Sequence, residues 1–336
     1  MKTAVIILNW NGARMLQKFL PSVVENTPEA EIIVADNGST DSSLELLKEQ
    51  FPNVRTIILD RNYGFAEGYN LAIDAVDNEY VVLLNSDVEV PEGWLTPLIT
   101  YMDSNIDVAA CQPKLLAYND KTMFEYAGAA GGFIDRYGYP FCRGRIFSSV
   151  EHDDGQYNKV KDVHWATGAC MLVRRDVYKQ LGGLDARFFA HNEEIDLCWR
   201  MRLKGYRVVC IPDSKVYHVG GGTLPQGNPR KTYLNFRNNL TMLYKNLPER
   251  DLRRVMRWRR LLDMIAMAQS LAKCNVADVK AIIKARRDFK AWKTEYAPIR
   301  EAIQQDAAST SLLMPYSILW HYFVRHKKHY SDLPDA

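Results

Sequence analysis

Two side chains that could bind a metal ion follow apolar runs in this sequence. Asp87 comes just after the run Tyr80–Leu84, and His218 follows a second apolar stretch and precedes three glycines. Each has an ordinary alternative, because an aspartate after a strand often starts a turn and a single histidine is more often packed than metal-bound. In one cleft, Asp87 and His218 would offer an oxygen and a nitrogen ligand to Mn2+ or Mg2+. Such a cation can hold a diphosphate and neutralise it as a leaving group.

Three acids stand at the start of a predicted helix over residues 193–204. Asp196 is placed to pair with Arg200 one turn later, which accounts for this acid on structural grounds. The adjacent Glu193 and Glu194 are not explained in this way. Consecutive helical side chains diverge by about 100°, so one can face a cleft while the other supports it. One of the two is therefore a candidate general base.

Other polar residues follow the ends of predicted strands and could bind a nucleotide. Asp36 ends an apolar run, where a carboxylate suits a hydrogen bond to a base or ribose. A dinucleotide-binding fold offers the same acid, but that fold needs G-x-G-x-x-G after its first strand, and Asn9-Trp10-Asn11-Gly12 stands there instead. A nicotinamide cofactor is thus disfavoured. The predicted nucleotide-binding residues are Asn9, Asn11, Asp36, Asn62, Gly64, Asn85 and Ser86.

Alternating apolar and helical patterns must position these residues. Strands are expected at residues 4–8, 31–35, 54–59 and 80–84, with helices at 15–26, 42–50 and 66–75. This βαβαβαβ order predicts an α/β fold with a mainly parallel sheet flanked by helices, which binds ligands beyond the carboxyl ends of its strands. Residues 108–219 show a mixed pattern and should build the acceptor side of the cleft. From residue 226 to the end the pattern predicts helices, so we expect a catalytic domain at 1–225 and a helical region at 226–336.

Charge divides the chain at the same point. Residues from Gln226 onward contain 21 Lys and Arg against 10 Asp and Glu, and the preceding part contains 22 against 30, which gives about +11 and −8. The basic part includes the amphipathic stretch 250–267 and the aromatic stretch Leu312–Val324. These stretches either contact an anionic membrane surface or pack on the catalytic domain with solvated arginines. Nucleic-acid binding is not expected, because the aromatic residues fall at helical spacing rather than on a stacking platform.

Scattered cysteines indicate a reduced, cytoplasmic protein without a zinc site or disulfide framework. The short apolar run at the N-terminus suits a buried strand better than a signal peptide, and no run of about 18 apolar residues predicts a bilayer span.

The order of the motifs resembles a family two glycosyltransferase of the bacterial rhamnosyltransferase-like branch. Seven segments carry this resemblance across nearly all of residues 1–223: Val5–Gly12, Val34–Ser43, Asn62–Asn70, Leu83–Val90, Thr167–Arg175, Gly182–Val208 and Val216–Thr223. It implies a GT-A fold, a nucleotide-diphospho-sugar donor, a divalent cation and inversion at the anomeric carbon. It also implies that the sugar comes from a dTDP- or UDP-linked donor, with rhamnose as one candidate, and is transferred to a glycan during cell-surface polysaccharide synthesis. The expected acceptor is a lipid-linked glycan at the inner face of the cytoplasmic membrane.

The resemblance also assigns roles to individual residues. Asp36 would bind the nucleoside, Asp87 and His218 the cation, and Glu194 would be the base. Two positions depart from the family pattern: Asn85 replaces the first acid of the D-x-D element, and Glu193–Glu194 replaces a Glu-Asp pair. The segment with Trp165, Thr167 and Gly168 is expected to line the acceptor side, and a buried strand is the equal alternative.

Two other functions remain open from the sequence. A nucleotidyltransferase would share an open sheet, but it normally needs a Gly- and Arg-rich triphosphate loop that Asn9–Gly12 lacks. A non-catalytic carbohydrate- or nucleotide-binding relative is compatible with the two departures from the family pattern.

Overall fold

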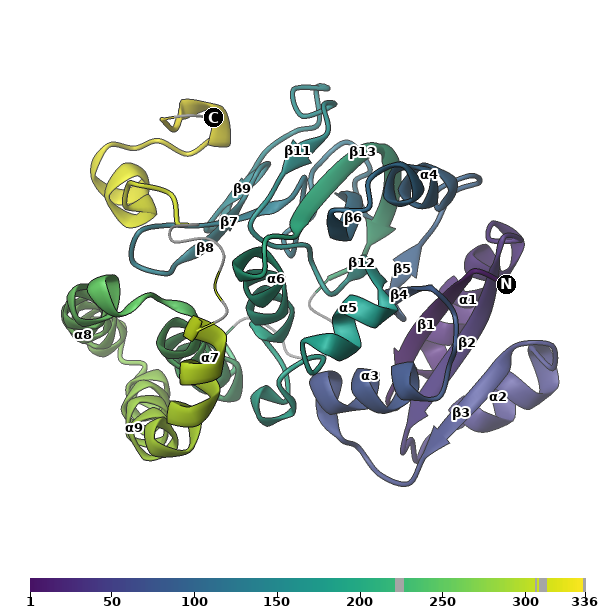
Figure 1. The fold of residues 1–336 in the computed structure, drawn as a ribbon, viewed down its shortest axis with the longest axis horizontal. Coiled ribbons are helices and arrows are strands. Elements are labelled where there is room, and N and C mark those ends of the chain that lie inside the picture. The colour runs from purple at the N-terminus through teal and green to yellow at the C-terminus, as the bar shows by residue number, and fades with distance from the viewer. Residues whose placement is uncertain (221–226, 306, 308–312, 335–336) are drawn as a thin grey trace.

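A computed structural model describes residues 1–220, 227–305, 307 and 313–334. Within these residues, a mixed nine-stranded sheet forms the centre of the molecule (Figure 1). Its strands are β1 (Thr3–Asn9), β2 (Ala30–Asn37), β3 (Arg55–Leu59), β4 (Tyr80–Asn85), β5 (Val88–Glu89), β6 (Val108–Ala117), β11 (Lys161–Asp162), β12 (Cys170–Arg174) and β13 (Arg207–His218).

The order of the strands is β11-β13-β6-β12-β4-β1-β2-β3, with β5 paired to β13. β1 lies parallel to both β2 and β4, and β2 lies parallel to β3. β12 runs antiparallel between β4 and β6. The expected parallel βαβαβαβ arrangement is therefore confirmed, and each predicted strand and helix of the first 85 residues is present to within about three residues at its ends.

Alternation along the strands explains how the sheet is buried on both faces. Ile6, Ile33 and Leu83 belong to one core cluster, whereas their neighbours Ile7, Val34 and Leu84 belong to another. Successive strand residues point to opposite faces, so continuous apolar runs supply both cores. Helices α1 (Ala13–Glu25), α2 (Ser43–Gln50) and α4 (Thr96–Ser104) pack on the second cluster, while α3 (Gly64–Asp74), α5 (Arg175–Gln180) and α6 (Glu193–Leu203) pack on the first.

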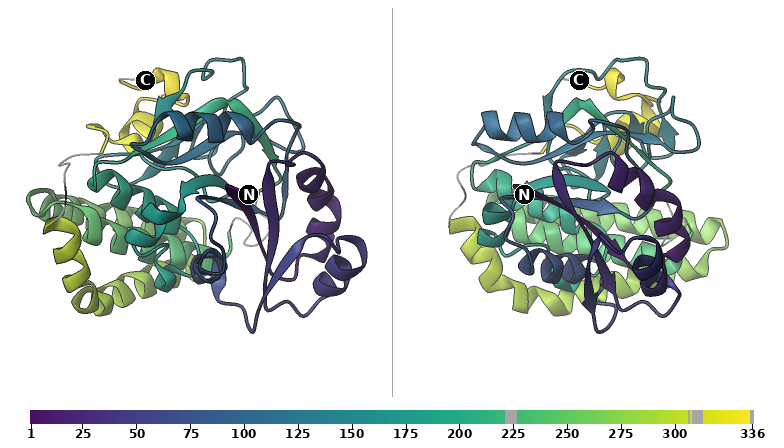
Figure 2. Two further views of the ribbon diagram at one scale, coloured as in Figure 1. Left: turned by 45° about the vertical axis from the view of Figure 1, so that its right-hand side comes forward. Right: turned by 90° about the vertical axis from the view of Figure 1, so that its right-hand side faces the viewer.

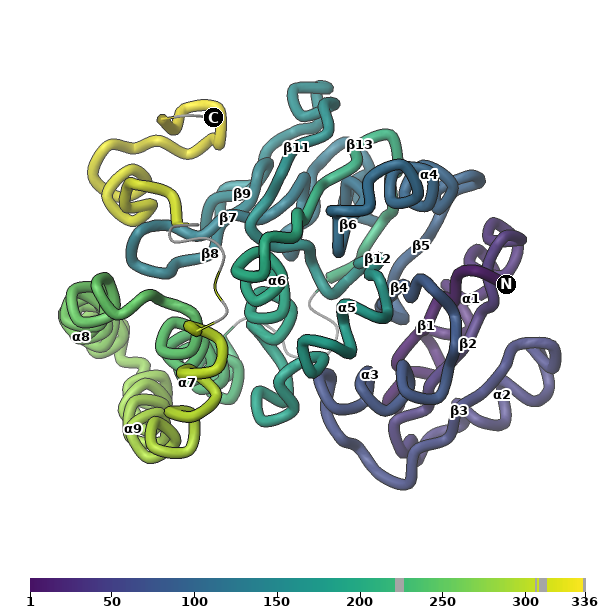
Figure 3. The backbone as a smooth tube through the Cα atoms, viewed as in Figure 1, coloured from purple at the N-terminus to yellow at the C-terminus, as the bar shows by residue number. Residues whose placement is uncertain are grey.

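A second, four-stranded sheet lies beside the main one. Its order is β10 (Ser149–Val150), β9 (Arg145–Ile146), β8 (Pro140–Cys142) and β7 (Gly132–Ile134). The C-terminal segment 313–334 runs along this small sheet, as the chain path in Figure 3 shows. Its Tyr330 ring stacks against Phe133 and Phe141 at 5.2 and 6.4 Å, and its Ile318 N–H donates to Asp135 at 2.9 Å.

Three long helices form the region after residue 228: α7 (Pro229–Asn246), α8 (Glu249–Ala272) and α9 (Val276–Gln305). They group next to α6, at the opposite end of the molecule from α2 and β3 (Figures 1 and 2). Side chains of α7, including Leu240 and Leu243, join the same core cluster as the main sheet. The domain boundary near residue 226 stays a prediction.

The expectation of helices to the end of the chain is wrong for most of the described residues after α9. Leu312 lies outside the described residues, and within 313–334 the helical parts are residues 318–324, which end in the π-helix η2 (Trp320–Val324), and the short 3-10 helix η3 (Tyr330–Asp332). Pro315 lacks a backbone donor and disfavours helix in the residue before it. The aromatic residues that suggested a helix face are instead partly used for packing on the small sheet.

All six cysteines are free, and only Cys274 is exposed. None of the helices in the described part of the chain combines the length and apolar character needed to cross a bilayer.

Candidate active site

The carboxyl ends of β1 and β2 carry polar side chains that bond to one another. Asn9 and Asp36 are paired in the strand register and fully buried, and the Asn9 amide donates to the Asp36 carboxylate at 3.0 Å. The same amide donates to the Ser39 hydroxyl at 3.2 Å, and the Ser39 N–H donates to Asp36 at 2.9 Å. Asn11, at φ 51°, accepts from the Thr40 N–H at 2.7 Å. Three predicted nucleotide-binding residues, Asn9, Asn11 and Asp36, therefore form one hydrogen-bonded group at this edge of the sheet, the nucleotide edge.

Asn62 and Gly64 extend this edge at the start of α3. Asn62 accepts a hydrogen bond from the Gly64 N–H at 2.8 Å. Gly64 has φ 80°, and a Cβ there would come within 2.5 Å of the Phe189 ring, so both its backbone conformation and its surroundings require glycine. The Phe189 carbonyl accepts from the N–H groups of Phe65 and Ala66 at 2.7 and 3.2 Å. The first turn of α3 is thus bonded to the segment that precedes α6.

Asp87 and His218 meet although 131 residues separate them. The Nε2 atom of His218 lies 3.0 Å from the Asp87 carboxylate and 3.3 Å from the Asn85 amide nitrogen, while Nδ1 lies 3.3 Å from Glu125. Burial lowers the pKa of His218, but the two acids on either side outweigh it and raise the pKa to about 10. Burial also opposes ionisation of Asp87, yet its contact with His218 holds its pKa below the usual value. The structure therefore places the imidazole of His218 between two buried acids, Asp87 and Glu125.

The side chains at this point are compatible with a divalent cation. Asp87 and His218 supply the oxygen and nitrogen donors that were expected, and Glu125 stands behind the histidine as carboxylates do behind many metal-bound imidazoles. A cation would have to replace the proton on His218, which makes binding dependent on pH. Among the described residues no group of three or more His, Cys, Asp or Glu side chains is arranged around one metal position. The remaining ligands would come from elsewhere, such as diphosphate oxygens or water.

The glutamate pair at the start of α6 is buried and short of hydrogen-bond partners. Glu193 is 4% exposed and Glu194 is partly exposed, and one carboxyl oxygen of each has no partner. Burial raises the pKa of Glu194 to about 7. Burial raises the pKa of Glu193 well above its usual value, with a further contribution from the charge of Glu194. A carboxyl group with a pKa near neutrality is suited to general base catalysis.

The backbone before this pair is strained. Phe189, His191 and Asn192 have φ of 67°, 73° and 68°, and none of them is glycine. Such conformations cost roughly 1–3 kcal/mol each, so surrounding contacts must hold them, and they often occur at active sites.

Residues 165–168 link the two sides of the site. The Ala169 carbonyl accepts from the Asn85 N–H at 3.0 Å, and a Cβ on neighbouring Gly168 would come within 3.0 Å of the Phe65 ring and 3.7 Å of the Glu194 Cβ. Gly168 therefore lies between α3 and the glutamate pair, and the residue after it is bonded to β4, the strand that precedes Asp87.

The other two predicted acceptor residues are buried. Trp165 is 3% exposed and its indole N–H donates to the Phe133 carbonyl at 3.1 Å. Thr167 is 2% exposed, and its hydroxyl accepts from the Ala169 N–H at 3.2 Å. Both lie outside the named strands, because β12 begins only at Cys170. Whether Trp165, Thr167 and Gly168 line the acceptor side stays a prediction, as do Ser86 and the roles of the other site residues.

Comparison with known proteins identifies the family. The family model described as "Glycosyl transferase family 2" matches residues 4–182, more than half of the chain. This chain belongs to that family. The expected resemblance is thereby confirmed, and the protein is a glycosyltransferase. Asn9, Asp36 and Asp87 all lie within the matched range.

Two curated relatives illustrate what this glycosyltransferase is similar to. It is 27% identical over 231 residues to an N-acetylglucosaminyl-diphospho-decaprenol L-rhamnosyltransferase of Mycobacterium tuberculosis, covering 64% of this chain and 75% of that relative. It is 28% identical over 225 residues to the O-antigen biosynthesis protein RfbC of Myxococcus xanthus, covering 65% of this chain but 17% of that relative.

A solved structure shows the same fold. The crystal structure of GalNAc-T7 with UDP, GalNAc and Mn2+ superposes with a TM-score of 0.61 at 17% identity, over 92% of this chain and 58% of that one. The GT-A fold expected from the sequence is confirmed.

Sequence reasoning missed two residues that contact the predicted site. Glu125 faces His218 from the segment after β6, and Asn238 of α7 contacts the segment before α6. No pattern around either residue distinguishes it from other polar residues. Both are recognised only from contacts between distant parts of the chain.

Proposed function

We propose that this glycosyltransferase moves a hexosyl group, with rhamnose as the first candidate, from a dTDP- or UDP-linked donor to a hydroxyl of a lipid-linked glycan, with inversion. The observation that carries the proposal is the meeting of Asp87 and His218 at the ends of β4 and β13, beside a segment that also contacts the glutamate pair. The names of the mycobacterial relative and of RfbC support the sugar, the lipid-linked acceptor and polysaccharide synthesis.

In this proposal Asp87 and His218 hold a divalent cation, which is Mn2+ in the GalNAc-T7 structure. When bound, the cation neutralises the charge that develops on the departing nucleotide diphosphate. Glu125 keeps the imidazole of His218 in place through the contact at Nδ1. The polar edge with Asn9, Asp36 and Asn62 would bind the nucleoside and ribose.

Glu194 is the better-placed base of the pair, because it is the more exposed of the two and lies near Gly168. The acceptor oxygen attacks the anomeric carbon while Glu194 takes the hydroxyl proton. The bond between the anomeric carbon and the diphosphate oxygen breaks, and its electron pair leaves with the nucleotide. Glu193 is the more deeply buried of the two, and burial together with the charge of Glu194 raises its pKa well above the usual value, so it stays protonated when Glu194 is ionised.

A donor panel tests this proposal. UDP-, dTDP- and GDP-sugars are offered with Mn2+, Mg2+ or a chelator, and binding and slow hydrolysis are measured for the native protein, Asp87→Ala and Glu194→Gln. We expect one donor class to bind only with metal, Asp87→Ala to abolish that binding, and Glu194→Gln to bind without turnover. If no donor binds under any condition, the non-catalytic binding alternative replaces the proposal.

We further propose that α8 contacts an anionic membrane, where a lipid-linked acceptor would be found. Trp258, Leu261, Met264 and Ile265 are each 43–49% exposed, and exposed arginines lie among them. Apolar side chains flanked by basic ones suit the interface of an anionic bilayer. The aromatic turn η2 adds Trp320 and Phe323, which are 54% and 55% exposed and precede four exposed basic residues.

Vesicle sedimentation tests the membrane proposal. We expect binding to vesicles with anionic lipid but not to neutral ones, and Trp258→Ser should weaken it about threefold or more. Ile58→Ser is the matched control, because Ile58 is 65% exposed on β3, far from the basic helices. Equal losses in both variants, or no binding to anionic vesicles, would rule the contact out.

A further inference from the structure

One side chain of the C-terminal helices holds the strained segment that leads into the glutamate pair. The Asn238 amide of α7 donates to the backbone carbonyls of Phe188, Ala190 and His191 at 3.0, 2.9 and 2.8 Å. Asn238 is itself fully buried, and its carbonyl oxygen accepts from the Arg237 Nε at 2.9 Å. The two amide hydrogens are thus shared among three acceptors within four consecutive residues.

These acceptors belong to the segment with three non-glycine residues at positive φ. Phe188 and Ala190 each directly precede a residue with positive φ, and His191 has a positive φ itself, so all three bonded carbonyls lie where the backbone would relax if it were not held. Between them the Phe189 carbonyl bonds to the first turn of α3, beside the predicted nucleotide edge. A shift of this segment would therefore move the start of α6, and with it Glu193 and Glu194, relative to the donor side.

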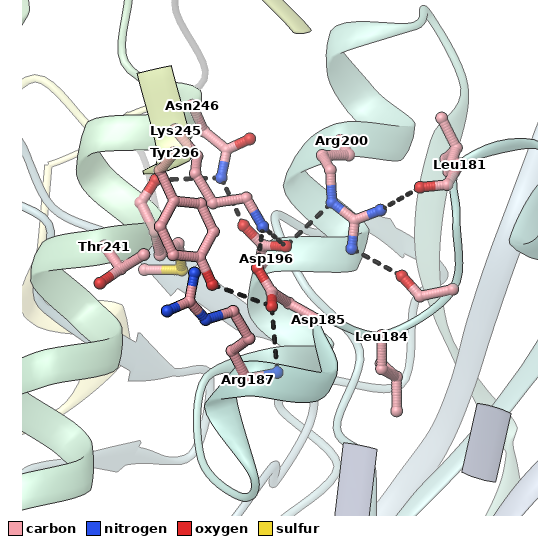
Figure 4. Close-up of polar contacts among 12 residues, drawn as sticks. Leu181, Leu184, Asp185, Arg187, Asp196, Arg200, Thr241, Lys245, Asn246 and Tyr296 are labelled. Atoms are coloured by element: carbon pink, nitrogen blue, oxygen red, sulfur yellow. Dashed lines mark hydrogen bonds and ion pairs between the residues drawn. The ribbon is translucent and has the colours of Figure 1, made fainter. Parts of the chain in front are cut away.

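The helix that carries Asn238 is fixed firmly against α6. Lys245 bonds to Asp196 at 2.9 Å and to Asp185 at 2.6 Å, and the Asn246 amide donates to Asp196 at 2.8 Å (Figure 4). Asp196 also pairs with Arg200 at 2.9 Å, as the sequence predicted. Lys245 follows Asn238 by seven residues, which places both on the same face of α7. The buried ion pairs fix the position of α7. In this position the Asn238 amide can donate to the segment 188–192.

We propose that Asn238 is a positioning residue for the transfer reaction: through the segment 188–192 it fixes the catalytic glutamate at the acceptor hydroxyl. The C-terminal helices are then a required part of the active site. The proposal rests on the assignment of the base to the Glu193–Glu194 pair.

The chain offers a matched control at the next position. Asn239 is also buried in α7, its amide donates to a backbone carbonyl, that of Gly138 at 2.8 Å, and its oxygen accepts from Arg259. Gly138 lies in the turn between β7 and β8, not in the segment before α6. Asn238→Asp and Asn239→Asp therefore remove the same kind of donor from the same helix, and only the first affects the segment.

The experiment measures transfer to a glycan acceptor with the donor class that the panel identifies, together with nucleotide affinity, pH–rate profile and melting temperature. We expect Asn238→Asp to lower kcat by about 10- to 100-fold and to displace the pH dependence of kcat, because the base would be misplaced. Nucleotide affinity should stay within about threefold of the native value, because the donor site is not altered. Asn239→Asp should keep kcat within about threefold and an unaltered pH profile. Equal kcat in the two variants, or a loss explained by melting alone, overturns the proposal.

Two further pairs of variants separate the possible failures. If Asn238→Asp does not fold, the pair Asn238→Ser and Asn239→Ser gives the same comparison with one donor retained, and the same difference in kcat is expected. Glu193→Gln and Glu194→Gln are measured in parallel. Full activity in both would overturn the base assignment of the proposed function, whereas their inactivity combined with a normal Asn238→Asp would overturn only the role of Asn238.

Discussion

The two sides of the site differ in how well their polar groups are satisfied. On the nucleotide side, Asn9, Asp36 and Ser39 bond to one another, and only the Asn9 carbonyl oxygen of these side chains lacks a partner. On the base side, one oxygen each of Glu193 and Glu194 has no partner, and the backbone before them is strained. A surface whose side chains are already ordered binds its ligand more tightly. A general base, in contrast, needs a carboxylate oxygen without a partner and a raised pKa. The comparison suggests that stability is concentrated on one side and reactivity on the other.

The largest effect should come from the base side. Glu194→Gln removes the proton acceptor while preserving the size of the side chain, so we expect kcat to fall by about 10²- to 10⁴-fold with donor affinity nearly unchanged. Glu193→Gln should lower kcat less, because Glu193 is the more buried of the two and its raised pKa keeps it protonated. Steady-state transfer assays and nucleotide titrations measure both quantities. A larger loss for Glu193→Gln would exchange the two roles.

The proposed metal position at Asp87 and His218 can be tested through Glu125, the carboxylate that contacts Nδ1 of His218. Removing the carboxylate behind a metal-bound imidazole typically costs 10- to 100-fold in metal affinity, so Glu125→Gln should weaken Mn2+ binding by that amount. Titration of Mn2+ in the presence of nucleotide, followed by electron paramagnetic resonance, measures it. Glu89→Gln is the control, because Glu89 is a nearby acid on β5 that pairs with Lys121 rather than with His218. Equal affinities for the two variants would remove Glu125 from the site.

The nucleotide side should respond in affinity rather than in rate. Asp36→Asn replaces an acceptor of the Ser39 N–H with a weaker one and removes a charge, so we expect nucleotide affinity to fall about tenfold. The value of kcat at saturating donor should stay within a few-fold. Isothermal titration with the nucleotide measures the first, and initial rates the second. A fall in kcat without a loss of nucleotide affinity would contradict the assignment of nucleotide binding to one side of the site and of proton transfer to the other.

Local patterns in the sequence were sufficient to predict one side of the molecule more fully than the other. Strands β1, β2 and β4, which lead to Asn9, Asp36 and Asp87, are apolar runs followed by polar residues, so the local sequence is enough to predict them. Asn238 contacts the Ala190 carbonyl, and Glu125 contacts the imidazole of His218, from distant parts of the chain. No periodicity in the sequence indicates these partners. The sequence predicted helices to the end of the chain, but of residues 313–334 only 318–324 and the short 3-10 helix η3 are helical, and Tyr316 and Tyr330 pack on the small sheet instead.

The smallest expected effect is on thermal stability. Its dependence on pH has opposite signs for two acids of α6, Glu194 and Asp196. Burial raises the pKa of Glu194 to about 7, whereas the pKa of Asp196 is lowered because Lys245 and Arg200 outweigh its burial. The raised pKa means that Glu194 contributes stability below its unfolded value of about 4.3 and loses it as pH rises through 7. Glu194→Gln should therefore melt at a higher temperature than the native protein at pH 8, by roughly 2 °C or more, with the difference shrinking towards pH 5.

Asp196→Asn should behave in the reverse way. Its lowered pKa contributes stability that is present above its unfolded value and lost as pH falls, so the variant should be less stable than the native protein at pH 8 and approach it in acid. Thermal melts of both variants at pH 5, 6, 7 and 8 give the two trends. If Glu194→Gln is destabilised at pH 8, the carboxylate forms favourable contacts in the folded state. The contrast between a satisfied nucleotide side and an unsatisfied base side would then not hold.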